Sequence, residues 1–209
     1  MMPDIDGISL VKKLKADLNY SHIPIILLSA KIENSTKIEG LRSGADVFIE
    51  KPFSTLYLKA QISSLLKNRK AILDVFNSSP LAPYSTIVTN KSDEYFLNKL
   101  NEEIEKNMAD ENFTVEHLTD VLNISRSSLQ RKLKSISGYS PGDYLRNYRL
   151  KKACLLLLES DSRINEVAFR VGFNSASYFT KVFYKSYNMS PKEFINYHIK
   201  NIKKSSELI

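Results

Sequence analysis

The sequence has little cysteine and no long apolar run, and these absences exclude several classes of protein. Its one cysteine, Cys154, cannot form a disulfide within the chain, which fits a reducing compartment. Because Cys154 lies in the apolar run 153–158, we expect a buried structural thiol. No apolar stretch approaches the roughly 18 residues of a membrane span, and the start, MMPDIDG, lacks the features of a secretory signal. We therefore expect a cytoplasmic chain without membrane contact.

Groups that could support catalysis are also scarce. The sequence has no glycine-rich nucleotide loop, and its three histidines, His22, His117 and His198, are scattered. None of them lies in the His-Glu context of a kinase, and nothing in the sequence supports metal ligation. We predict that this chain is not an enzyme and that it contains no catalytic residue, no metal site and no cofactor.

Positive charge is concentrated in the second half of the chain. The formal net charge is +7. Residues 111–209 contain 16 Lys and Arg against 9 Asp and Glu, whereas residues 71–110 contain 3 against 7. An excess of positive charge suits a polyanionic partner such as nucleic acid.

The most informative pattern is a segment that recurs about 50 residues later. Residues 115–141 and 164–191 each predict two short amphipathic helices around a tight turn, which is the helix-turn-helix pattern. We call these copies the first head and the second head, and expect both to bind double-stranded DNA. In our alignment the offset is constant as far as the pairing of Ser128 with Ser177, and a one-residue slip follows before Arg131 pairs with Lys181.

Local signals predict the shape of each head. Thr114 should cap the opening helix, and Asn123 and Gly172 suit the left-handed turn positions. Ser125 and Asn174 should cap the second helices. The side chains predicted to point inward are Leu118, Val121, Leu122, Leu129, Leu133, Ile136, Phe179, Val182 and Phe183. A helix through 144–158, with its cap at Ser140, would be about 28 Å long and could hold the heads about one DNA turn apart.

The second half resembles a known family. Arg149–Ala153 with Leu156–Leu157, Val167/Ala168 with Gly172/Phe173, Ser177–Phe179, and Ser190/Pro191 with Phe194 resemble the signature of AraC/XylS-type DNA-binding domains over residues 113–197. The resemblance implies that one helix of each head reads bases, with Lys181 and Asn188 replacing the usual Arg and Gly. The implied DNA-binding residues are Arg126, Ser127, Gln130, Arg131 and Lys134 in the first head and Ser175, Ala176, Ser177, Thr180, Lys181 and Lys185 in the second.

The first seventy residues predict an α/β unit with a parallel sheet. Apolar runs at Ile23–Ser29 and Asp46–Glu50 suit buried strands, and helices are predicted over 8–18, 34–43 and 54–70. Met1–Gly7, Pro24–Ala30 and Gly44–Phe53 resemble the second half of a response-regulator receiver domain, which is flavodoxin-like. The resemblance implies three switch residues: Ser29 and Lys51, which would contact an aspartyl phosphate, and Phe48, which would report the state.

The same resemblance implies that the phosphoacceptor and the magnesium-binding acids lie before Met1. We therefore expect a fragment begun at an internal methionine, with Mg²⁺ and aspartyl phosphate bound only in the full-length receiver. A sheet without its first strands would expose the edge of Ile25–Leu28, and open edges invite pairing. Residues 1–70 are expected to self-associate or to be poorly ordered.

The fold class predicted is thus an α/β fragment followed by an all-α domain with two helix-turn-helix motifs joined by a long helix. We place a partial receiver at 1–70, a linker at 71–93 and the DNA-binding domain at 94–202. The linker assignment rests on the Pro-, Ser- and Thr-rich stretch Asn77–Asp93. The following helix, Asp93–Met108, carries three outward glutamates, so it should face away from DNA.

A receiver followed by the sequence Asp93–Lys99 and this domain is similar to the C-terminal end of hybrid two-component regulators of gut Bacteroidetes. The resemblance implies a histidine kinase portion in the full-length protein and control of carbohydrate-utilisation genes. Two alternatives stay open: a sensor-kinase fragment with phosphorelay activity, or a dimerisation module without specific DNA reading.

Overall fold

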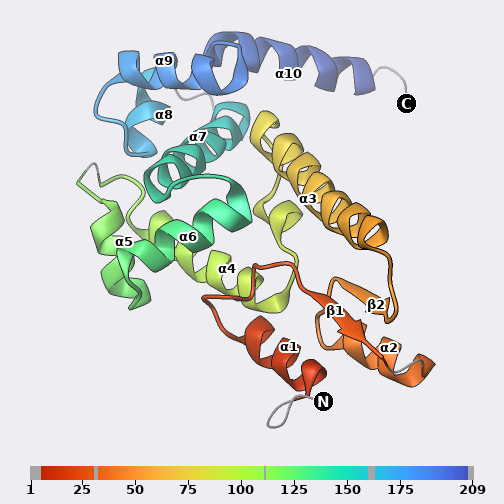
Figure 1. Ribbon diagram of the computed structural model, residues 1–209. Coiled ribbons are helices and arrows are strands. Elements are labelled where there is room, and N and C mark those ends of the chain that lie inside the picture. Colours follow the sequence, from red (N-terminus) through yellow and green to blue (C-terminus); the bar gives the residue numbers. More distant parts are fainter. Residues whose placement is uncertain (1–5, 31–32, 111, 160–162, 207–209) are drawn as a thin grey trace.

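The structure is a computed structural model that describes residues 6–30, 33–110, 112–159 and 163–206. The N-terminal part contains α1 (Gly7–Ala16), β1 (Ile26–Ser29), α2 (Asn34–Arg42), β2 (Val47–Glu50) and the long α3 (Thr55–Ser78). A short 3-10 helix, η1 (Tyr84–Ile87), leads to a helical part. Figure 1 shows that part as α4 (Lys91–Lys106), α5 (Val115–Leu122), α6 (Arg126–Ser137), α7 (Pro141–Glu159), α8 (Ile164–Arg170), α9 (Ala176–Tyr187) and α10 (Pro191–Ser206).

The two strands are parallel, as predicted, and both are shorter than the apolar runs that contain them. Ile26 pairs with Val47, and Ser29 with Glu50. Lys15 of α1 joins the helix to both strands, because its ammonium donates to the Ile23 carbonyl at 2.9 Å and to the Asp46 carboxylate at 3.1 Å. We call residues 6–70 the α/β segment.

Helix α3 continues eight residues beyond its predicted end at Lys70. The extension carries Phe76, which is fully buried in the core of the helical part. Its sequence has no breaker before Pro80, and Leu73 and Phe76 keep helical spacing. The α/β segment is therefore joined to the helical part by a continuous helix, and the Pro-rich connector begins only after Ser78.

The helical part has one hydrophobic core with α7 at its centre. Helix α7 packs against α5, α6, α8 and α10 (Figure 1). Leu145, Leu150, Ala153 and Leu157 of α7 are buried, and Cys154 is fully buried among them. Cys154 is buried, as the sequence predicted, and this burial raises the pKa of its thiol to about 12. The fully buried side chains from the surrounding helices include Leu100, Ile104, Leu118, Leu129, Leu133, Phe179, Phe183 and Phe194.

Candidate nucleic-acid interface

The first head has the local geometry that its sequence predicts. The Thr114 amide donates to His117 Nδ1 at 3.1 Å in a capping box at the start of α5. Asn123 takes the left-handed turn conformation, with φ 51°. Ser125 caps α6 by accepting from the Ser128 amide at 3.1 Å, and α6 ends at Gly138 with φ 78°. The Ser125 side chain thus sets the start of α6, and the left-handed backbone of Gly138 sets its end.

One side chain of the first head does not follow the prediction. Val121 was expected to be buried beside Leu118 and is 47% exposed. Helix α5 has only eight residues, so it presents a narrow face to the core. Leu118 is fully buried on that face, and Val115 and Leu122 pack against the core beside it.

The second head repeats this arrangement with a different turn. Gly172 is left-handed, with φ 82°, and is packed so closely that an added Cβ would lie 2.3 Å from the Met108 carbonyl oxygen. The predicted cap Asn174 is wrong, because Ser175 caps α9 and accepts from the Tyr178 amide at 3.3 Å. Helix α9 ends at Asn188, which is left-handed with φ 57°, as expected.

The two heads differ by one residue inside the turn. Helices α6 and α9 each have 12 residues, and their caps Ser125 and Ser175 are 50 residues apart. The left-handed residues Asn123 and Gly172 are only 49 apart, so the extra residue is Asn174. Ser128 therefore corresponds to Tyr178 and not to Ser177, which corrects our sequence alignment. Asn and Ser are both good N-caps, so local preference could not place the slip.

All five residues predicted for the first head are exposed: Arg126, Ser127, Gln130, Arg131 and Lys134. Some of them have intramolecular partners. Arg126 forms an exposed ion pair with Glu116 at 2.9 Å, and Lys134 donates to the Gly138 carbonyl at 2.8 Å. Exposed ion pairs contribute little free energy, so Arg126 is available to an anionic ligand, and the exposed Lys134 has only a backbone carbonyl as its partner.

In the second head the predicted residues divide into two groups. Ser177, Thr180, Lys181 and Lys185 are exposed, whereas Ser175 and Ala176 are half-buried. Sequence reasoning missed two tyrosines of α9, Tyr178 at 47% and Tyr184 at 54% exposure. The signal that could have identified Tyr184 is the α6–α9 correspondence, in which Tyr184 occupies the position of Lys134.

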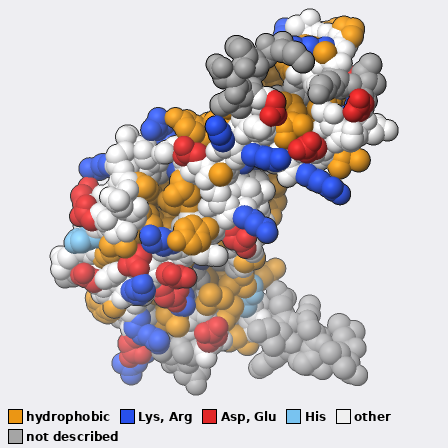
Figure 2. All heavy atoms as spheres, turned by 90° about the horizontal axis from the view of Figure 1, so that it is seen from below, with side chains coloured by type: hydrophobic (Ala, Val, Ile, Leu, Met, Phe, Trp, Pro, Cys, Tyr) orange, Lys and Arg blue, Asp and Glu red, His pale blue; other side chains and the backbone are white. Residues whose placement is uncertain are grey.

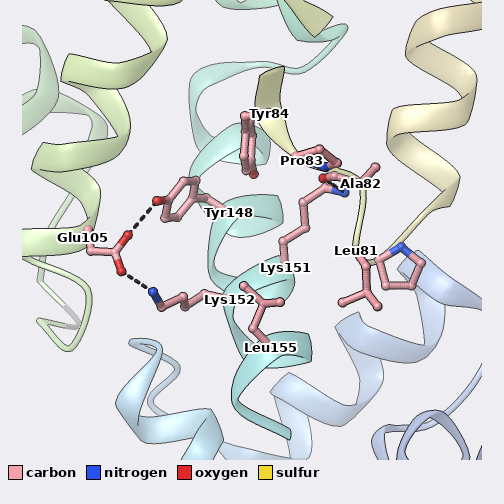
Figure 3. Close-up of a pocket in the computed structure, with 10 residues that line it drawn as sticks. Leu81, Ala82, Pro83, Tyr84, Glu105, Tyr148, Lys151, Lys152 and Leu155 are labelled. Carbon is pink, nitrogen blue, oxygen red and sulfur yellow. Dashed lines mark hydrogen bonds and ion pairs between the residues drawn. The ribbon is translucent and has the colours of Figure 1, made fainter. Parts of the chain in front are cut away.

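Two glutamates of the acidic helix α4 have partners on α7 or on α4 itself. Figure 3 shows Glu105 between two side chains of that helix, with one oxygen accepting from the Tyr148 hydroxyl at 2.9 Å and the other pairing with Lys152. The hydrogen bond from Lys152 lowers the pKa of Glu105. Glu103 pairs with Lys106 of its own helix at 2.5 Å. These carboxylates are thus neutralised by partners outside α6 and α9.

The three predicted switch residues lie on the two strands or directly after them. Ser29 ends β1, Lys51 follows β2 directly, and the Lys51 amide donates to the Ser29 carbonyl at 2.8 Å. The bond between Lys51 and Pro52 is cis. Ser29 and Lys51 line one groove at the carboxyl end of the strands, where parallel sheets bind ligands. Phe48 lies within β2, half-buried, and lines a different groove.

Within the described ranges, no three His, Cys, Asp or Glu side chains are grouped in a way that could hold a metal ion. The same residues include no helix with the length and apolar character of a membrane span.

Two family models match separate parts of the chain: the response regulator receiver domain over residues 1–63 and a helix-turn-helix domain over residues 118–197. The histidine kinase P4 of Formosa agariphila is 35% identical over 196 residues, which are 94% of this chain and 14% of that protein. The transcriptional activator CfaD of Escherichia coli is 31% identical over 144 residues, 69% of this chain and 48% of that protein. The chain thus spans half or less of these relatives.

Among solved structures, the chain is similar to the C-terminal domain of the two-component response regulator YesN from Fusobacterium nucleatum. The sequence identity is 33%, the match covers 48% of this chain and 98% of that one, and the TM-score is 0.44.

Proposed function

We propose that this chain is the DNA-binding output end of a two-component transcription regulator. Its residues 1–63 match the response-regulator receivers, and its residues 118–197 match the AraC-type helix-turn-helix domains. The observation that carries the proposal is the pair α6 and α9. Both helices have 12 residues, serine caps and exposed polar faces. The helix-turn-helix relatives are transcription regulators, and we propose no enzymatic role.

We assign base reading to the exposed faces of α6 and α9. In the first head, Arg131 suits guanine and Gln130 suits adenine, because each can form two hydrogen bonds to the major-groove edge of that base. Lys181 lacks the planar fork of arginine, so its reading should be weaker. The remaining base contacts are assigned to Ser127, Ser177 and Thr180, with the Ala176 methyl group against a thymine methyl. Phosphate contacts are assigned to Arg126, Lys134, Ser175 and Lys185.

The separation of the heads predicts the form of the DNA site. Helix α7 has 19 residues, which correspond to about 28 Å at about 1.5 Å per residue. A rod of that length suits recognition helices about one turn of DNA apart, near 34 Å. We expect two half-sites on one face of the duplex, about 10 base pairs apart between centres.

The experiment is selection from a pool of random duplexes, followed by electrophoretic shifts at several salt concentrations. Arg131→Ala should cost about 1–3 kcal/mol on the selected site and relax one base position. Lys134→Ala should weaken all sequences alike and lower the salt slope by about one unit. Lys99→Ala, at an exposed position of α4, is the matched control and should change neither quantity. An equal loss on selected and random DNA for Arg131→Ala would contradict base reading.

We also propose a wider context for the chain. The 35% identity to a histidine kinase supports a kinase portion in the full-length protein, whose receiver would bind Mg²⁺ and accept phosphate. Cytoplasmic location and carbohydrate-utilisation genes as targets complete this proposal. We also propose the domain limits 1–70, 71–93 and 94–202, with the last eight residues of α3 inside the middle unit. Transcript profiles of a deletion strain grown on different polysaccharides would test the targets, and unchanged carbohydrate operons would exclude them.

Self-association through residues 1–70 is part of the same proposal. Large apolar side chains are exposed there, with Leu56 at 80% and Leu66 at 60% on α3 and Leu41 at 51% on α2. On the face that Figure 2 shows, apolar side chains reach the surface between basic and acidic ones. Sedimentation velocity tests the proposal, and a monodisperse monomer with slow amide exchange across Ile25–Leu28 would refute it.

A further inference from the structure

Lys132 is unusual for a lysine on a recognition helix. It lies in the middle of α6 next to the exposed Arg131, yet only 3% of its surface is exposed. Its ammonium donates to the Leu18 carbonyl at 2.6 Å, to Ser21 Oγ at 2.8 Å and to Asp93 Oδ1 at 2.9 Å. A lysine ammonium has three donors, and all three are used. A buried lysine with every donor satisfied forms a specific contact and not an incidental one.

Two of these three acceptors come from the α/β segment. Leu18 and Ser21 lie in the turn between α1 and β1, while Asp93 belongs to α4. Asp93 is also fully buried, and it accepts from Ser21 Oγ at 2.7 Å as well as from Lys132. We call Lys132, Asp93, Ser21 and the Leu18 carbonyl the Lys132 site. Without the turn, the ion pair would lose two acceptors of the lysine and one donor to the aspartate.

Further contacts hold the same turn and the same helix. Asn90, the cap of α4, donates to the Ser21 carbonyl at 3.0 Å and to Asp93 Oδ2 at 2.8 Å. At the C-terminal end of α6, Arg69 of α3 donates to the Ile136 carbonyl at 2.7 Å. The α/β segment therefore contacts α6 at its middle and at its C-terminal end.

The helix-turn-helix fold does not itself require this lysine. The caps of α6 and α9 are 50 residues apart, so the position equivalent to Lys132 in the second head is Val182. Val182 is a half-buried apolar residue packed against the ordinary core. Figure 1 shows α8 and α9 at the opposite end of the molecule from α1 and the strands. The first head alone carries a charged side chain where the second has a core residue, and the first head alone has the α/β segment behind it.

We propose that the α1–β1 turn docks on the back of α6 through the Lys132 site, and that Lys132 is a positioning residue for the first recognition helix. The docked turn holds α6 from the side opposite Gln130 and Arg131. The α/β segment thereby controls the DNA affinity of the first head and leaves the second head unaffected. This inference rests on the proposed function and names the head on which the receiver acts.

The test changes the turn and leaves both heads intact, in the full chain. Ser21→Lys places a second ammonium against Lys132 and should expel the turn, whereas Ser21→Ala removes only one hydrogen-bonding hydroxyl. Ser35→Lys, at an exposed position of α2, adds the same charge away from α6 and is the matched control. The probes are selected duplexes in which either the first or the second half-site is scrambled.

The expected result is selective. Ser21→Lys should weaken binding to the duplex that retains only the first half-site by about tenfold, a change typical of lost hydrogen bonds to a charged group. Binding to the duplex that retains only the second half-site should stay within about twofold, and Ser21→Ala should show a smaller loss of the same pattern. Equal losses on both duplexes, or no loss on either, would overturn the inference.

Amide hydrogen exchange provides a readout that needs no DNA. In Ser21→Lys the amides of Leu129–Leu133 in α6 should exchange about tenfold faster than in the parent, while those of α9 stay unchanged. Faster exchange in both helices indicates general unfolding, and unchanged exchange in α6 means that the turn does not hold it; either result overturns the inference. If the parent chain selects no DNA, the proposed function fails, whereas the exchange pattern still decides whether the turn holds α6.

Discussion

Gly172 is the position at which one added methyl group should lower the free energy of unfolding most. Its φ of +82° lies in the left-handed region, which costs an L residue about 1–2 kcal/mol. An added Cβ would also lie 2.3 Å from the Met108 carbonyl oxygen and 2.8 Å from the Arg149 guanidinium. The first of these is a backbone atom that cannot move aside alone, and overpacking of this kind costs about 1–3 kcal/mol. Gly172→Ala should therefore lower the free energy of unfolding by about 2–5 kcal/mol.

Urea unfolding followed by circular dichroism measures this loss. Gly142→Ala is the control, because Gly142 lies in the first turn of α7 with no atom within 4 Å of the added Cβ, and it should gain up to about 1 kcal/mol of helix propensity. Gly172→Asn separates the two causes, since the left-handed Asn123 shows that asparagine accepts such a turn in this chain. If Gly172→Ala loses under about 1 kcal/mol, the close contact with Met108 is not the constraint that we infer.

Two further predictions concern buried groups of α7. Burial raises the pKa of Cys154 to about 12, so the native chain should react with a disulfide reagent only as fast as it opens, and fast labelling of a folded chain at neutral pH would contradict this. Burial lowers the pKa of Lys151 from 10.5 to about 8, so between these values the unfolded chain holds more protons than the folded one. The free energy of unfolding should rise with pH across that window, by up to about 1.4 kcal/mol per pH unit. Lys151→Met should flatten the rise in urea titrations at several pH values, and an equal slope in both proteins would count against it.

The parts of the fold that follow from short-range chemistry could be predicted from the sequence. Asn123 and Gly172 are left-handed because few other residues accept those dihedrals, and Ser125 caps α6 because its hydroxyl reaches an amide three residues on. These signals depend on neighbours within a few residues. From such signals the sequence predicted both heads, the long helix between them and the parallel pair of strands.

The parts that depend on distant partners could not be predicted. Lys132 follows Arg131 in a basic helix and has the sequence pattern of a solvated cation. It is buried because its partners lie 39 to 114 residues away along the chain. The length of α3 has a similar cause, since Phe76 extends the helix by entering the core of the helical part. In the candidate site, sequence identified the exposed faces of the helices but misplaced the extra residue of the second turn.

The differences between the two heads predict an operator with unlike halves. In the shared hydrophobic core the heads agree in type, with Leu129 and Leu133 of α6 matched by Phe179 and Phe183 of α9. On the exposed faces they differ: Gln130 corresponds to Thr180 and Lys134 to Tyr184.

These faces present different donors and acceptors, and a side-chain amide and a hydroxyl favour different base edges. One chain should therefore select two half-sites of different sequence, and not a palindrome. Replacing Gln130 by Thr, while Ser127 and Arg131 stay, should shift the first half-site toward the sequence of the second in the same selection experiment. Identical halves from the parent chain, or an unchanged first half-site in the Gln130→Thr variant, would show that Gln130 does not read a base.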